Sequence, residues 1–171
     1  MSRPGNALRF LRRYLWFLSD ARRLELYPPF WLMGVKTLEL SPDWGRIRLR
    51  LPLTWRSRNL GGSMFGGYQA ALADPIAALA CSKRFPDHDV WTRHLCLDFR
   101  RPGTTDLELR FDFPPEQQER IAAELAERGR ADPEFEYGYH LADGRRCTTV
   151  HCRVALRPRG YAAHLGVGSA S

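Results

Sequence analysis

Hydrophobic and polar residues alternate along several stretches of this chain, with the period of two that is typical of strands buried on one face. The clearest stretch is 45–53, where Ile or Leu at every odd position from 47 to 53 alternates with Arg46, Arg48 and Arg50. Similar alternation is found over residues 35–41, 90–100, 107–113, 135–141 and 148–156. Turn signals such as Asp143-Gly144 separate neighbouring stretches. We therefore expect about six antiparallel strands.

The stretch 90–100 has an unusually polar second face. Strict alternation places one set of large apolar side chains together: Trp91, Leu95, Leu97 and Phe99. The other face receives Thr92, His94, Cys96 and Asp98. This pattern predicts a strand with one apolar and one unusually polar face.

One stretch between the predicted strands has the composition of a loop followed by a buried helix. Four glycines fall within residues 61–67, which is incompatible with a packed element, whereas residues 68–82 are mostly Ala and Leu. The only carboxylate between Asp43 and Asp87 is Asp74, within this apolar segment. A helix that is apolar on all faces belongs in a core, where an isolated acid is costly unless it is hydrogen-bonded or functional. Asp74 is therefore a candidate functional residue.

The remaining elements lie outside this central unit. Leucines recur at helical spacing over residues 6–23 among several arginines, which predicts a basic amphipathic N-terminal helix in residues 1–26. Tyr27-Pro28-Pro29-Phe30 is expected to end any helix, because proline donates no backbone hydrogen bond and restricts the residue before it. Such a helix packs on the domain or on a neighbouring subunit, or it could lie on a membrane surface. A main domain is expected over 27–158, with a charged surface helix at 116–129, and residues 159–171 are predicted to be a flexible tail.

The predicted elements favour an α+β fold in which one curved antiparallel sheet wraps around a single long helix. Such a sheet has free edges, and it covers only part of a helix that is apolar all round. A second copy of the chain could bury both. We therefore expect a homo-oligomer, either a dimer or a tetramer.

The net charge and the cysteines indicate what kind of partner and what kind of cysteine site to expect. A net charge of +7 favours an anionic partner, such as nucleic acid, acidic lipid or a phosphorylated ligand, without choosing among them. The four cysteines are expected to be buried thiols, and no metal site is predicted, because a strand would place Cys147 and Cys152 on opposite faces. The sequence lacks a membrane-spanning apolar run and a signal peptide, which predicts a cytoplasmic protein.

The segment from about Tyr27 to Pro158 resembles the hotdog-fold acyl-CoA thioesterases of the phenylacetyl-CoA thioesterase type, and most closely an uncharacterised branch of that superfamily. In these proteins an Asn and a Gly-x-x-His-Gly-Gly-like loop precede the central helix, and an acid follows the Asn by fifteen residues. Asn59, the loop Gly62-Ser63-Met64-Phe65-Gly66-Gly67 and Asp74 have this spacing. The resemblance implies an acyl-CoA ligand, a homodimer or homotetramer, no cofactor and no nucleic acid partner.

The resemblance also implies a role for particular residues. The Gly66 N–H would receive the thioester carbonyl, Asp74 would act as base or nucleophile, and Asn59 would orient the water or the carbonyl. Thr92 would help to position the water. The substrate would be contacted by a further set around the loop: Arg58, Met64, Phe65, Gly67 and Tyr68.

The chain departs from the thioesterase pattern at Phe65, where those enzymes usually have His. A hotdog protein that binds an acyl-CoA or a fatty-acyl ligand without turnover is therefore the alternative. Two residues also have structural interpretations. Asp74 followed by Pro75 could begin a second helical segment as an N-cap, and Asn59 could be a turn residue.

Overall fold

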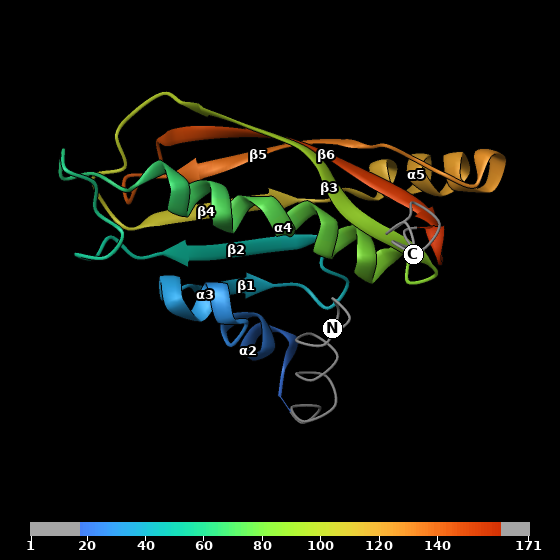
Figure 1. Ribbon diagram of the computed structural model, residues 1–171, viewed down its shortest axis with the longest axis horizontal. Helices are drawn as coiled ribbons and strands as arrows, with labels where there is room; N and C mark the ends of the chain where they lie inside the picture. The colour runs from blue at the N-terminus through green and yellow to red at the C-terminus, as the bar shows by residue number, and fades with distance from the viewer. Residues whose placement is uncertain (1–17, 162–171) are drawn as a thin grey trace, which may run out of the picture.

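The computed structural model describes residues 18–161, in which a six-stranded antiparallel sheet curves around one long helix (Figure 1). The strand order in the sheet is β1-β2-β4-β5-β6-β3. The strands are β1 Lys36–Leu40, β2 Arg46–Leu51, β3 His88–Phe99, β4 Leu107–Asp112, β5 Glu134–His140 and β6 Arg146–Pro158. The helices are α2 Asp20–Glu25, α3 Pro28–Met33, α4 Gly66–Arg84 and α5 Pro115–Arg128. The predicted α+β architecture is confirmed.

The middle of the sheet follows the alternation of the sequence. Ile47 and Leu49 of β2 lie opposite Phe111 and Leu109 of β4, and all four side chains are buried. The intervening arginines of β2 lie on the outer face, where Arg48 donates two hydrogen bonds to the carboxylate of Asp112. Each buried aliphatic side chain contributes roughly 1.5–3 kcal/mol through the area removed from water.

Helix α4 lies across the concave face of the sheet (Figure 1). Its inner face buries Leu72, Ala73 and Ile76 completely. Two tyrosines of β5 fix the helix to the sheet, since the Tyr137 hydroxyl donates to the Ala73 carbonyl at 2.7 Å and the Tyr139 hydroxyl to the Gln69 carbonyl at 2.6 Å. These two hydrogen bonds satisfy the polar hydroxyl groups of the tyrosines within an otherwise apolar layer.

Strand β3 differs from its predicted pattern because it contains a bulge. The register with β6 shifts between Thr92 and His94, so Arg93 has no partner residue in the ladder. An extra residue reverses the alternation beyond it. Trp91 therefore faces outward rather than with Leu95 and Leu97, and Thr92 faces the central helix, where its hydroxyl donates to the Asp74 carbonyl at 2.6 Å.

The N-terminal part of the described chain also departs from expectation. Most of the helix predicted over 6–23 lies outside the described residues, and Ser19 accepts a hydrogen bond from the Arg22 N–H as the N-cap of α2. Residues 27–30 not only end a helix, as expected, but begin α3, because Pro is tolerated in a first helical turn. Helix α2 packs on the domain, with Glu25 accepting from the Thr37 N–H at 2.9 Å.

All four cysteines were expected to be buried, but only three of them are. Cys81, Cys147 and Cys152 are buried, whereas Cys96 is exposed on the outer face of β3. Burial raises the pKa of the Cys81 thiol to about 12, which keeps it protonated at neutral pH. Within residues 18–161 no cluster of His, Cys, Asp and Glu has a metal-binding arrangement. The same residues contain no helix long and apolar enough to cross a membrane.

Candidate active site at the start of the central helix

A closed loop precedes the central helix and is held together by Asn59 and Ser63. The Asn59 side-chain amide donates to the Ser63 hydroxyl at 3.0 Å, and its carbonyl oxygen accepts from the Ser63 N–H at 3.1 Å. Gly62 has a φ of 80°, which favours glycine at that position of the loop. Both polar groups of the Asn59 side chain therefore stabilise a turn in this conformation.

The chain enters α4 in a fixed position. The Met64 N–H donates to the Gly103 carbonyl at 2.8 Å, and the Phe65 N–H donates to the Ser57 carbonyl at 2.7 Å. Phe65 then occupies the N-cap position with extended backbone and no side-chain cap. Among the described residues, the N–H groups of Gly66 and Gly67 have no hydrogen-bond acceptor. Two free donors therefore stand at the positive end of the helix dipole.

The first of these donors, Gly66, lies at a pocket of about 310 Å³ between the loop, the first turn of α4 and the chain that follows β3. The lining residues are Asn59, Ser63, Met64, Gly66, Gln69, Phe99, Arg100, Arg101, Pro102 and Gly103. Of the residues predicted for the site, the structure brings three together here, namely Asn59, Met64 and Gly66. The ring of Phe99 lies against Gly66, so close that a Cβ at this glycine would lie 3.0 Å from the ring.

Gln69 is a feature of this pocket that the sequence interpretation missed. Its side chain is only 2% exposed, and its carbonyl oxygen accepts a 2.6 Å hydrogen bond from the Thr148 hydroxyl of β6. This contact fixes the orientation of the amide and leaves its NH₂ group as a donor at the pocket. Gln69 is the one amide side chain of the apolar helix, one turn after Gly66, and this isolation was a signal in the sequence.

Asp74 and Thr92 lie away from that pocket, further along α4. Asp74 is exposed, and its carboxylate has no ion-pair or hydrogen-bond partner among residues 18–161. Helix α4 continues through Pro75, so Asp74 does not serve as an N-cap. The contact from the Thr92 hydroxyl supports the helix where Pro75 removes a backbone donor. Gly66 and Asp74 are eight residues apart, or roughly 12 Å along one helix.

The other predicted substrate contacts surround the helix start without lining the pocket. The Phe65 side chain is 52% exposed, and its ring meets Tyr68 edge-on with the centroids 6.3 Å apart. A Cβ on Gly67 would overlap the Phe65 ring, so a larger residue there would require this exposed ring to turn away. Arg58 is exposed beside Met64, with which it forms an isolated bridge.

The curved sheet around a central helix and the loop at the helix start define a hotdog fold, and solved structures share it. A Pseudomonas aeruginosa protein of unknown function, described as a probable thioesterase, is 22% identical with a TM-score of 0.70, covering 93% of this chain and 99% of its own. A Haemophilus influenzae thioesterase is 16% identical with a TM-score of 0.64, covering 82% and 92%. A Staphylococcus aureus thioesterase is 12% identical with a TM-score of 0.57, covering 74% and 96%.

The family of the chain follows from its sequence. Residues 18–156 match the family described as "Domain of unknown function (DUF4442)", and the chain belongs to this family. The match begins before α2 and therefore includes both α2 and α3. No curated protein matches the chain.

Proposed function

We propose that this protein hydrolyses an acyl-CoA thioester. The observation that carries the proposal is the pocket at the start of α4, where the N–H group of Gly66 has no acceptor within the described chain. Donors that are already positioned at a helix N-terminus suit the negative charge that develops on a carbonyl oxygen during acyl transfer. The shared fold of structures named as thioesterases supports the same reaction class.

In the proposed reaction, Asp74 acts as the base for a water molecule, with Thr92 beside it. The water oxygen bonds to the thioester carbon while its proton passes to Asp74, and the carbonyl oxygen becomes an oxyanion that accepts from the Gly66 N–H. The C–S bond then breaks. The departing thiolate takes the proton from Asp74, which leaves a carboxylic acid and free CoA.

Two subunits are required for this arrangement, because Gly66 and Asp74 of one chain are too far apart to act on one carbonyl group. We therefore place the loop of one subunit opposite Asp74 of its partner in a homodimer. Two surfaces support this assembly. The side of α4 that carries Ala71 and Asp74 is exposed, and the twelve-residue strand β3 forms one edge of the sheet. A long free edge strand is a surface that proteins usually cover.

The remaining predicted residues have supporting roles in this proposal. Met64 forms the buried base of the pocket, and Gln69 offers its amide as a further donor. Phe65, Gly67 and Tyr68 would contact the acyl group or the pantetheine arm from the neighbouring surface. Arg58 would attract the phosphates of CoA, as expected for an exposed guanidinium in a chain of net charge +7.

A second candidate function is the binding of an acyl-CoA or fatty-acyl ligand without turnover. It is favoured by Phe65, which places an apolar ring where the thioesterases that the loop resembles have a polar imidazole. The hydrogen bonds of Asn59 with Ser63, and of Thr92 with the Asp74 carbonyl, favour it as well. The Thr92 hydroxyl uses its single donor in this contact, so it would need to exchange that partner before it could donate to a water.

Thiol release distinguishes the two functions. We expect purified protein to release CoA from at least one member of a panel of short, aromatic and long acyl-CoAs, followed with a thiol reagent. The control is the same panel with the Asp74→Asn variant, which retains any binding surface. Binding of an acyl-CoA with no release above the Asp74→Asn background would favour the binding protein and contradict the hydrolase.

A further inference from the structure

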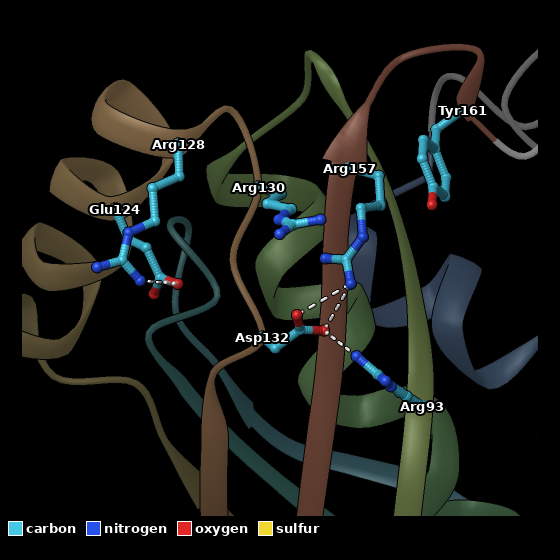
Figure 2. A pocket seen from close by; sticks show the side chains of 7 residues that line it. All are labelled: Arg93, Glu124, Arg128, Arg130, Asp132, Arg157 and Tyr161. Atoms are coloured by element: carbon cyan, nitrogen blue, oxygen red, sulfur yellow. Dashed lines mark hydrogen bonds and ion pairs between the residues drawn. The ribbon is translucent and has the colours of Figure 1, made fainter.

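A pocket rich in arginine lies where α5 and β6 end (Figure 2). This is the opposite end of the molecule from the start of α4 (Figure 1). Its volume is about 450 Å³. We call it the arginine pocket and define it by its lining residues: Arg93, Glu124, Arg128, Arg130, Asp132, Arg157 and Tyr161. Four guanidinium groups face two carboxylates, which leaves two positive charges without a counter-charge in the lining.

The base of the arginine pocket is rigid. Arg157 is 8% exposed, and its Nη1 donates to the carbonyls of Ala131 and Leu156 at 3.0 and 2.8 Å. Its Nη2 donates to both oxygens of Asp132 at 2.9 Å, and Arg93 donates to the same carboxylate at 3.1 Å. Two guanidinium groups therefore share one carboxylate at fixed positions (Figure 2).

Asp132 remains ionised in this arrangement. Burial alone would raise the pKa of its carboxyl, but the hydrogen bonds and positive charges of Arg157 and Arg93 outweigh burial and lower it. The carboxylate therefore compensates one of the two guanidinium charges and holds both groups in place. The second positive charge stays uncompensated.

The arginine side chains at the rim of the arginine pocket are less restrained than those at its base. Arg130 has no ion-pair or hydrogen-bond partner among residues 18–161, and Figure 2 shows it between α5 and β6. Arg128 is only loosely paired, with its guanidinium 3.9 Å from Glu124 and 3.8 Å from Glu127. Exposed pairs of this length contribute little and can exchange partners at low cost.

An aromatic pair lies beside the arginine pocket. The rings of Trp91 and Tyr161 are stacked with centroids 6.3 Å apart, and the Arg157 guanidinium lies 5.8 Å from the centre of the Trp91 ring. This position for Trp91 follows from the bulge at Arg93, which turns the side chain to the outer face. The aromatic rings limit access of water to one side of Arg157.

We propose that the arginine pocket binds a phosphate group, either a phosphate monoester or a pyrophosphate. Guanidinium forks match the geometry of phosphate oxygens, and a doubly charged anion balances the two uncompensated charges. The pocket is distinct from the site at Gly66, and this proposal does not depend on thioester hydrolysis. The phosphate could belong to a free inorganic anion or to a phosphorylated nucleotide, and the two sources are distinguished by experiment.

Titration calorimetry of the full chain with inorganic pyrophosphate and with adenosine 3′,5′-bisphosphate tests the proposal. Arg130→Ala should weaken binding about tenfold, because it removes one charge-assisted contact. Arg120→Ala is the matched control, since Arg120 is an exposed arginine of α5 that does not line the pocket, and this variant should bind like the unchanged protein. Tighter binding of the bisphosphate than of pyrophosphate would identify a nucleotide as the source.

The Glu124→Gln variant tests the proposal in the opposite direction. Loss of this carboxylate removes one of the two partners of Arg128 and a negative charge from the lining, so binding should become several-fold tighter at low salt. The proposal is overturned if neither anion binds at millimolar concentrations, or if Arg130→Ala and Arg120→Ala weaken binding equally. Equal effects would mean that only the net charge of the chain attracts anions.

Discussion

Replacement of Asp74 by Asn should reduce thioester hydrolysis by at least about a hundredfold, because an amide cannot take a proton from water. The fold should be unaffected, since the Asp74 side chain is exposed and makes no ion pair or hydrogen bond with residues 18–161. Surface substitutions of this kind change the free energy of unfolding by about 0.5 kcal/mol or less. Steady-state release of CoA and thermal unfolding measure the two quantities.

Asp87→Asn is the matched control for this change. The Asp87 side chain is 91% exposed and lies in the turn after α4, so the substitution alters the net charge identically at a position away from the site. It should leave both activity and stability unchanged. If the Asp74→Asn variant hydrolyses the thioester as fast as the Asp87→Asn variant does, Asp74 is excluded as the base.

Gly66→Pro should lower the rate constant for hydrolysis by about 10² to 10³, as removal of one oxyanion donor does in other enzymes. Proline has no N–H, but it suits the first position of a helix, and Phe65 already has the extended backbone that a residue before proline adopts. The helix start should therefore be retained. Single-turnover kinetics would separate this loss from any change in substrate binding.

The control for Gly66→Pro is Gly66→Ala, which retains the N–H. Both variants add a carbon atom near the ring of Phe99, and this ring is 53% exposed and free to turn. Gly66→Ala should therefore show the steric cost alone, and we expect most of the activity to remain. Equal losses in the two variants would mean that crowding against Phe99, and not the donor, is responsible.

The fold could be predicted from the sequence where each residue's neighbours along the chain determine its environment. The alternation of β2 predicted its buried face because every second residue of a strand faces the same side, and Ile47, Leu49 and Leu51 are all fully buried. The glycine-rich loop and the Ala-rich stretch predicted α4 for the same reason. Local composition was sufficient in both places.

Prediction was wrong where one residue changed the local pattern. The bulge at Arg93 exchanged the faces of Trp91 and Thr92, and periodicity alone does not reveal an inserted residue. Helix α3 was missed because Pro28-Pro29 was interpreted only as a helix stop, although Pro also favours a first turn. Cys96 was expected to be buried like the other cysteines, although the alternation put it on the polar face of its strand, and the pairing with β6 leaves that face exposed.

The candidate site could be predicted only in the part that lies close together in the sequence. The loop and helix start form one continuous segment, so the sequence could place Asn59, Met64 and Gly66 near one another, and all three line the pocket. Arg100, Arg101 and Gly103 enter the pocket because β3 ends beside that segment, and this contact depends on the folded sheet. The arginine pocket combines α5, β3 and β6, and no segment of the sequence contains enough of it to indicate an anion site.

The shared site is tested most directly by mixing two inactive chains. Gly66→Pro and Asp74→Asn protomers that pair at random should give mixed dimers in about half of all dimers, and each of these has one site with both changes and one with neither. Activity should therefore return to roughly a quarter of that of the unchanged protein. Co-purified mixed dimers as inactive as either parent would contradict a site built from Gly66 of one subunit and Asp74 of the other.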